Sequence, residues 1–136
     1  MDIEKSVGFL LAKAYQKACA IFKEYLDPYG LTPQQFSLLA FLWQQDGLSQ
    51  AELSTKSQID RTTMGGLIDR LQADGLVRRL PHPDDRRAHH ICLTEKGKGL
   101  EDELCALATT ARDRFVAGLS EQEHDSLQKL LEKLRY

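Results

Sequence analysis

Apolar residues recur every three or four positions over most of the chain, which is the spacing of one face of an α-helix. This pattern predicts helices over residues 3–26, 32–46, 49–56, 60–74 and 94–115, with a final helix from residue 120. Side chains that favour helix N-caps stand at the start of four of these segments: Thr32, Ser49, Asp60 and Ser120. Gly75 predicts the end of the helix that Asp60 begins.

Two short segments, residues 76–80 and 89–93, do not follow helical spacing and are predicted as strands. They flank a polar loop with two prolines, so they form a β-hairpin. The chain therefore has four helices, a hairpin and two further helices, a mainly α fold with a small β-hairpin. Two short helices joined by about three residues and followed directly by a hairpin are typical of a winged helix-turn-helix.

The composition fits one small globular domain that covers residues 1–136. With 42% hydrophobic and 28% charged residues, the chain is neither disordered nor membrane-like, and no apolar stretch is long enough to cross a bilayer. The N-terminus lacks the basic and then apolar order of a signal peptide. Three cysteines, an odd and sparse set, fit a reducing compartment. We therefore expect a cytoplasmic protein with no membrane partner.

Charge is unevenly distributed, although the formal net charge is only −2. Between Lys56 and Lys98 there are nine basic and six acidic residues, whereas the remainder has nine basic and fourteen acidic residues. A basic centre between acidic ends is the electrostatic outline of a localised nucleic-acid surface. A solvated face without a partner would look the same, so charge alone does not decide between the two.

The predicted helix at 60–74 carries the residue types that read DNA. A helix that enters the major groove by its N-terminal end would present Arg61, Thr62 and Thr63 to bases and phosphates, where its dipole favours negative charge. Arg70, two turns further on, would reach a flanking phosphate. The hairpin places Arg86 and Arg87 at its tip, where an arginine can enter a narrow minor groove.

Three sequence segments resemble the MarR family of transcription regulators. They are DRTTMGGLIDRLQADGLV at 60–77, PDDRR at 83–87 and ICLTEKG at 91–97. The resemblance covers essentially the whole chain and implies a homodimer that binds a palindromic operator in double-stranded DNA. The winged helix-turn-helix would occupy about 32–94, and long helices in about 1–28 and 95–136 would form the dimer.

The resemblance also implies roles for single residues. Asp84 would orient the wing and Arg86 would enter the minor groove, while Ser49 and Gln50 would begin the supporting helix and contact phosphates. Members of the family are usually repressors, released from DNA by a small phenolic or lipophilic ligand or by cysteine oxidation.

Two glycines, Gly65 and Gly66, depart from a regular recognition helix, since each costs about 1 kcal/mol relative to alanine. Their absent side chains would let the backbone approach the groove closely; the alternatives are a tolerated weakness of the helix and close packing against a neighbouring helix. Aromatic residues at helical spacing are more often plain core, but these four could line an effector pocket between helices: Tyr15, Phe22, Phe36 and Trp43.

The other chemistry-bearing residues have simpler interpretations. Cys19, Cys92 and Cys105 form no C-x-x-C pair, so inert thiols are favoured over a redox switch. His82, His89 and His90 lack partners at metal-site spacing, so they are interpreted as groove-facing or solvated and no metal or cofactor is expected. No nucleophile–base pair or phosphate loop indicates an enzyme. The leading hypothesis is an effector-released DNA-binding repressor; the alternatives are a thiol-based redox regulator and a winged-helix protein-interaction module without DNA binding.

Overall fold

The computed structural model describes residues 1–84 and 88–135. It organises the chain into two compact units. The winged-helix unit comprises Leu26–Cys105, and the terminal unit comprises Met1–Tyr25 together with Ala106–Tyr136. No helix among the described residues is both long enough and apolar enough to span a membrane.

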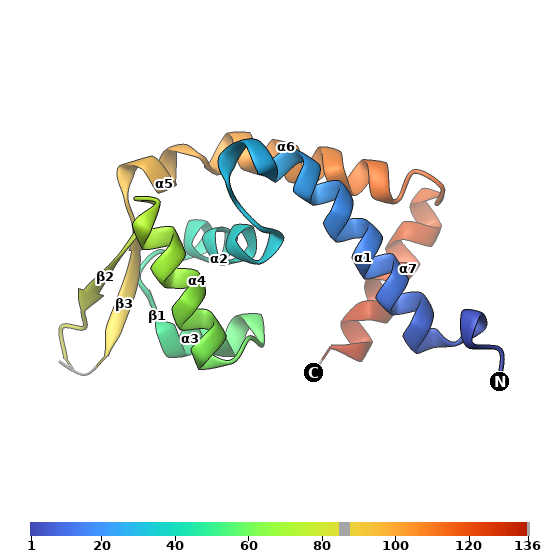
Figure 1. Cartoon of the computed structure of the whole chain (residues 1–136), viewed down its shortest axis with the longest axis horizontal. Helices are drawn as coiled ribbons and strands as arrows, with labels where there is room; N and C mark the ends of the chain where they lie inside the picture. Colours follow the sequence, from blue (N-terminus) through green and yellow to red (C-terminus); the bar gives the residue numbers. More distant parts are fainter. Residues whose placement is uncertain (85–87, 136) are drawn as a thin grey trace. The chain divides into compact units, whose positions relative to one another are not determined.

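The winged-helix unit packs helices beside a small sheet (Figure 1) and ends within the first part of α6 (Glu101–Phe115). Its elements in chain order are a 3₁₀ turn at Asp27–Tyr29, α2 (Pro33–Gln44), β1 (Leu48–Ser49), α3 (Gln50–Ser57), α4 (Arg61–Ala73), β2 (Val77–Pro81), β3 (His89–Leu93) and α5 (Glu95–Gly99).

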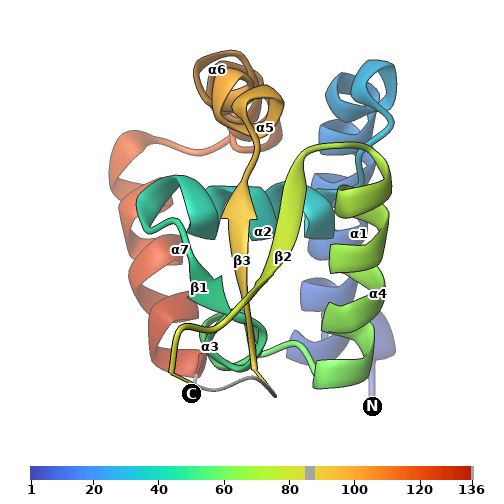
Figure 2. The same ribbon diagram turned by 90° about the vertical axis from the view of Figure 1, so that its left-hand side faces the viewer.

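The sheet is antiparallel throughout, with β3 between β1 and β2 (Figure 2). Cross-strand pairs place Leu48 and Arg79 on either side of Ile91. Ile91 is fully buried, as are apolar side chains from each of the three helices α2, α3 and α4, among them Leu39, Leu53 and Ile68. One core therefore fixes α2, α3 and α4 against the sheet, which is the layered arrangement a helix-turn-helix needs to present one helix rigidly.

The terminal unit is built from helices. It contains a 3₁₀ turn at Ile3–Lys5, most of α1 (Val7–Leu26), the second part of α6 (Glu101–Phe115) and α7 (Glu121–Leu134). An ion pair between Arg114 and Glu24 joins α6 to α1 within this unit. The hydrogen bond from Arg114 to Glu24 raises the pKa of the guanidinium, so this group stays ionised at all ordinary pH values.

The predicted helix starts are confirmed by their hydrogen bonds. Thr32, Ser49 and Ser120 each accept a bond from the backbone three residues on, and the side chains of Gln35, Glu52 and Glu123 accept one in return from the cap residue. These are reciprocal capping boxes, which satisfy two of the otherwise unpaired N–H groups of a helix start. Asp60 caps α4, and Thr94 caps α5. Gly75 follows α4 with a φ of +74°, a left-handed conformation that glycine adopts without strain.

Several predicted boundaries are wrong. The first helix begins at Val7 rather than residue 3, because Ser6 is extended and ends the preceding 3₁₀ turn. The second ends at Gln44, since Gln45 is already extended. The first strand of the hairpin is Val77–Pro81. The helix predicted over 94–115 is two helices, α5 and α6, that meet at Leu100. Finally, β1 adds a third strand to the predicted two-stranded hairpin.

Candidate nucleic-acid interface

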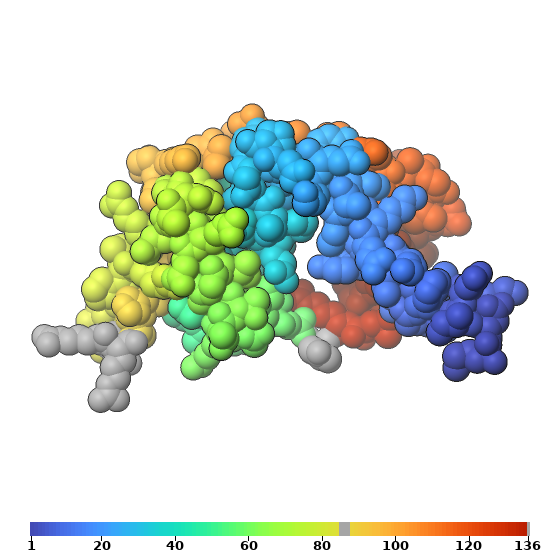
Figure 3. Space-filling view, in the orientation of Figure 1, coloured from blue at the N-terminus to red at the C-terminus, as the bar shows by residue number. Residues whose placement is uncertain are grey.

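Helices α3 and α4 are joined by three residues, 58–60, as many as predicted but one position later than the predicted 57–59. Gln58 makes the turn with a φ of 58°, the left-handed conformation that ends α3. One side of α4 is buried through Met64, Ile68 and Leu71, so its opposite side faces solvent. The green segment that contains α4 lies on the visible surface in Figure 3. The chain therefore presents one face of a 13-residue helix outward, with Gly66 and Arg70 exposed on it.

The first turn of α4 divides its polar groups between capping and solvent. Asp60 accepts hydrogen bonds from both the backbone N–H and the hydroxyl of Thr63, each at 2.8 Å. The backbone bond from Thr63 is the main reason that the pKa of Asp60 lies below its usual value. Because Thr63 is engaged by its cap, the side chains that this turn exposes without a capping role are those of Arg61 and Thr62.

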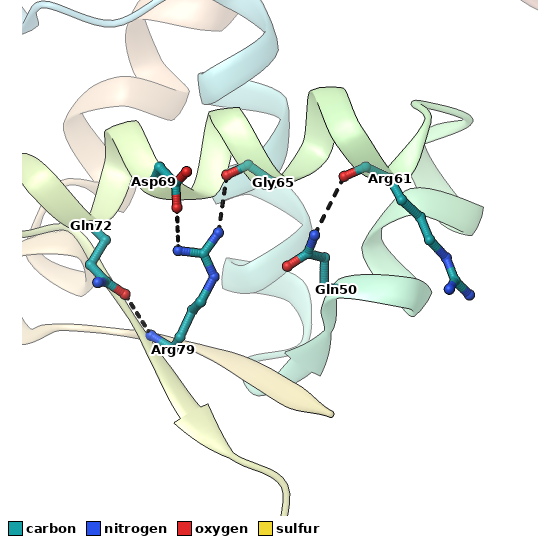
Figure 4. A network of polar contacts seen from close by, with 6 residues as sticks. All are labelled: Gln50, Arg61, Gly65, Asp69, Gln72 and Arg79. Carbon is teal, nitrogen blue, oxygen red and sulfur yellow. Dashed lines mark hydrogen bonds and ion pairs between the residues drawn. The ribbon is translucent and has the colours of Figure 1, made fainter. Parts of the chain in front are cut away.

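Gln50 connects the supporting helix to α4. Its amide Nε2 donates to the carbonyl oxygen of Arg61 at 3.4 Å, while the guanidinium of Arg61 extends away from this contact (Figure 4). A Cβ on Gly65 would lie 3.3 Å from the same Nε2 atom, tighter than most such contacts. Gly65 thus leaves room for the Gln50 amide, the end of a flexible side chain that a Cβ would displace by a few tenths of an ångström. Gly66 has no such neighbour, since a Cβ there would meet nothing within 4 Å.

Arg79 is a residue whose role the sequence did not reveal. It belongs to the basic centre of the sequence, yet its side chain is only 22% exposed and points from β2 to α4 (Figure 4). Its guanidinium pairs with Asp69 and donates to the carbonyl oxygen of Gly65 at 3.0 Å, and its backbone N–H donates to Gln72 Oε1 at 2.9 Å. Arg79 thus fixes α4 to the sheet that carries the wing, and it is a positioning residue.

The wing is described only at its base. The N–H of His82 donates to the carbonyl oxygen of Ala88 at 3.0 Å, which extends the hairpin pairing beyond the strands. Asp84 is exposed, and its backbone N–H donates to His82 Nδ1 at 3.2 Å. Arg86 and Arg87 lie outside the described residues, so the role of Asp84 in orienting Arg86 stays a prediction.

A cavity of about 340 Å³ lies where α3, α4 and β3 meet. It is lined by three residues predicted to contact DNA, Ser49, Gln50 and Arg61, together with Ala51, Ala88 and His89. The hydroxyl of Ser49 accepts the capping bond from the N–H of Glu52 at 3.0 Å. The structure therefore brings the start of the supporting helix and the start of the recognition helix to one concave polar surface.

The four predicted effector-pocket residues do not share one unit. Phe36 and Trp43 lie on α2 with their rings edge to face, 5.8 Å between centroids. The indole Nε1 of Trp43 donates to the carbonyl oxygen of Gly97 at 3.0 Å, which ties α2 to α5. Tyr15 and Phe22 belong to α1 in the terminal unit, and Tyr15 is 64% exposed. Trp43 therefore has a structural role, and a ligand site for these aromatic residues stays a prediction.

Two of the three cysteines have surroundings that disfavour the thiolate form. Burial raises the pKa of the Cys92 thiol, helped by the nearby Asp46, and burial also raises the pKa of the Cys105 thiol. Both groups are thereby held in the less reactive thiol form. Among residues 1–84 and 88–135, no three His, Cys, Asp or Glu side chains gather as a metal site would require.

Comparison with known proteins decides the family. The MarR family model matches residues 31–89, the stretch that contains the helix-turn-helix and β2 and ends at the first residue of β3. The HTH-type transcriptional repressor NicR of Pseudomonas putida is 36% identical over 133 residues, which are 98% of this chain and 84% of that protein. The chain belongs to the MarR family. Members of this family are transcriptional regulators rather than enzymes, and this MarR-family protein is a DNA-binding regulator.

Solved MarR-family structures have the same fold. The structure of Bordetella bronchiseptica BpsR, described as regulated in its DNA binding by 6-hydroxynicotinic acid, matches with a TM-score of 0.91 and 33% identity, covering 96% of this chain and 94% of that one. A cysteine-to-serine mutant of MarR from E. coli, complexed with operator DNA, matches with a TM-score of 0.89 and 27% identity, again over 96% and 94%.

Proposed function

We propose that this MarR-family protein is a homodimeric repressor that binds a palindromic operator and is released by a small aromatic effector. The observation that carries the proposal is the outward face of α4. The chain leaves Arg61, Thr62, Gly66 and Arg70 exposed, while Arg79 and the core hold the helix against the wing sheet. A rigidly held helix with a basic, partly side-chain-free face is what the major groove admits. The similarity to an operator-bound MarR structure supports this assignment.

Homodimer formation is supported by the apolar surface of the terminal unit. Among the described residues, every exposed large apolar side chain except Leu80 belongs to this unit: Met1, Ile3, Val7, Leu10, Leu11, Tyr15, Leu119, Leu130, Leu131 and Leu134. A hollow of about 360 Å³ between α6 and α7 is lined in part by Phe115 and Leu127. So much apolar surface is unusual on a monomer and marks a protein interface. A second copy would also supply the second half of a palindrome.

Release by an aromatic effector is supported by relatives rather than by a site in this chain. BpsR is described as regulated in its DNA binding by 6-hydroxynicotinic acid, and NicR is named a repressor. A hydroxylated aromatic acid is therefore the class of effector we propose. It would act by binding the DNA-free form more tightly than the DNA-bound form, because a ligand shifts an equilibrium only by its differential affinity.

The DNA-binding proposal predicts nanomolar to submicromolar binding to the duplex that flanks the protein's own gene, weakened steeply by salt. Fluorescence anisotropy at two salt concentrations measures the affinity and its dependence on salt. Each phosphate contact contributes about 0.9 to the slope of log affinity against log salt concentration. Adding 6-hydroxynicotinic acid or 4-hydroxybenzoic acid should lower the affinity and raise the thermal midpoint of the free protein. Indifference to every promoter duplex at low salt would instead favour a protein-interaction module.

The dimer proposal predicts that a Leu130→Asp, Leu134→Asp double variant is monomeric. Leu130 and Leu134 are exposed apolar residues of α7, so replacing them with aspartate should cost the monomer little stability. In a dimer, the same substitutions would place four carboxylates, two from each subunit, in the interface. Sedimentation velocity should show a single species of about 15 kDa, the mass of one chain. The matched Lys129→Asp, Lys133→Asp variant of the same helix should sediment as the wild type does. A double-leucine variant that still sediments as a dimer would place the interface elsewhere.

A further inference from the structure

His89 lines the cavity at the proposed interface together with the predicted DNA-contact residues Ser49, Gln50 and Arg61. It is the first residue of β3, is exposed, and is paired across the sheet with Pro81. The cavity brings it to the same concave surface as Arg61, which belongs to the first turn of α4. A cationic side chain and an imidazole from two separate elements thus line one polar hollow within the proposed DNA interface.

The neighbouring histidines, His82 and His90, are not among the residues that line the cavity. Side chains alternate between the two faces of a strand, so His89 and His90 point to opposite sides of β3. The ring of His90 lies edge to face against that of His82, with 5.9 Å between centroids, and His82 Nδ1 accepts the N–H of Asp84. Of these three histidines, His89 is the one that lines the cavity shared with α3 and α4.

We infer that Arg61 and His89 hold one phosphate of the DNA backbone between them. The inference rests on the proposed DNA binding and adds a contact to it. The other polar groups of the cavity have partners within the chain: Ser49 Oγ accepts the N–H of Glu52, and the Gln50 amide donates to the carbonyl oxygen of Arg61. The guanidinium of Arg61 and the imidazole of His89 are the cavity's groups best suited to bind an anion, and such phosphate contacts fix the register of a protein on a duplex.

The charges around His89 favour a phosphate there. Arg61 approaches from α4, and Pro81 and Ser49 face β3 from the two neighbouring strands. On α3 the nearest acid along the chain is Glu52, whose carboxylate accepts the backbone N–H of Ser49 at 3.3 Å, and on the α4 side Asp60 is bonded to Thr63. In the part of the chain that the structure describes, the carboxylates of Glu52 and Asp60 are thus committed to helix caps, whereas that of Asp84 in the hairpin loop is exposed. A bound phosphate would favour the protonated, cationic imidazole.

Operator binding should consequently take up protons. Histidine is the side chain that changes charge between pH 5 and pH 8, and the cationic form makes the stronger bond to phosphate. We expect the affinity to rise by roughly fivefold per subunit when the pH falls from 8.0 to 6.0, the size of an exposed charge pair. The salt slope should become steeper by about 0.9 per subunit over the same interval, because one more counterion is released.

The test measures duplex affinity by anisotropy at pH 6.0 and 8.0 and at two salt concentrations, for the wild type, His89→Gln, His89→Arg and the control His124→Gln on α7. His89→Gln should lose the rise at pH 6.0 and behave at both pH values as the wild type does at pH 8.0. His89→Arg should bind tightly at both pH values, and His124→Gln should keep the rise. All three variants should fold as the wild type does, because His89 is exposed and His124 is only partly buried. Thermal melting curves check this.

The outcomes separate this inference from the proposal beneath it. If the wild type binds duplex DNA but neither its affinity nor its salt slope depends on pH, the phosphate contact of His89 is wrong and the regulator remains. The phosphate contact of His89 is also wrong if His89→Gln keeps the full rise in affinity at pH 6.0, because another group, such as His82 or His90, must then take up the proton. If no duplex is bound at either pH, the DNA-binding proposal itself fails.

Discussion

Gly97→Ala is expected to lower the free energy of unfolding by about 2–3 kcal/mol, the cost of forcing extra atoms into a packed interior. A Cβ at this buried glycine would lie 2.2 Å from the carbonyl oxygen of Leu76 and 3.3 Å from Leu93 Cδ2. The oxygen cannot retreat easily. It accepts the N–H of Thr94 at 3.0 Å, and the N–H of Leu76 is bonded to the carbonyl oxygen of Leu71 at 3.0 Å.

The substitution should also disturb the two hydrogen bonds that join Gly97 to Trp43 on α2 and to Thr94, the cap of α5. Gly97 also accepts the indole N–H of Trp43, the sole tryptophan of the chain, and donates its own N–H to Thr94 Oγ1 at 3.1 Å. Moving α5 away from Leu76 would loosen both contacts. The Trp43 fluorescence spectrum of the folded variant should therefore shift, and the thermal midpoint should fall by roughly 3–5 °C for each kcal/mol lost.

Gly99→Ala is the matched control, since Gly99 lies on the same short helix and a Cβ there would meet nothing within 4 Å. The free energy of unfolding of the Gly99→Ala variant should equal that of the wild type or exceed it by up to about 1 kcal/mol, because glycine is the poorer helix former. Calorimetry or thermal circular dichroism compares the two variants. Equal midpoints for Gly97→Ala and the wild type would mean that α5 and Leu76 separate without cost, against the contacts described.

The sequence predicted the elements whose signals are local. Helix starts were found because a cap such as Thr32 and its return partner Gln35 stand three residues apart and need no information from the rest of the fold. The three-residue connection before α4 was found for the same reason. β1 was missed because Leu48–Ser49 is too short to show alternation and exists as a strand only through its pairing with β3.

The division between α5 and α6 was missed because nothing at Leu100 breaks a helix by itself. The backbone of Leu100 stays in the right-handed helical region, and Leu100 is neither a glycine nor a proline, so no residue type marks the division. The sequence showed Gly97 as the last residue of the ICLTEKG motif but did not show why a glycine is needed there. That reason, a carbonyl oxygen from a segment twenty-one residues earlier in the chain, is a tertiary contact that periodicity cannot show.

The candidate site was predicted in outline and revised in detail. A count of basic residues treats Arg79 and Arg61 alike, yet the structure turns Arg79 inward to Asp69 and leaves Arg61 exposed. It also separates two adjacent glycines that the sequence could not separate. Gly65 makes room for Gln50, whereas nothing among the described residues requires a glycine at Gly66. What distinguishes such neighbours is which side of the helix each occupies, and that depends on the whole packing of α4.

Gly66→Ala is expected to make the protein more stable and a poorer binder of DNA. Alanine in an open, exposed helix interior should add up to about 1 kcal/mol to the free energy of unfolding. If Gly66 lets the backbone of α4 approach the groove closely, the added methyl group meets the duplex and should weaken operator affinity by about tenfold or more, the effect of overpacking a close contact. A natural helix would then keep a destabilising residue because binding requires it.

Opposite changes in stability and affinity are what distinguish a functional glycine from a merely tolerated one. Gly99→Ala, which adds the same methyl group to another open helical position, should gain or keep stability and bind operator as the wild type does. Thermal melting and anisotropy on the same preparations give both quantities. Should Gly66→Ala gain stability and keep full affinity, the glycine would be an unoptimised surface residue, and the approach of α4 to DNA would have to be set by Arg61 and the wing alone.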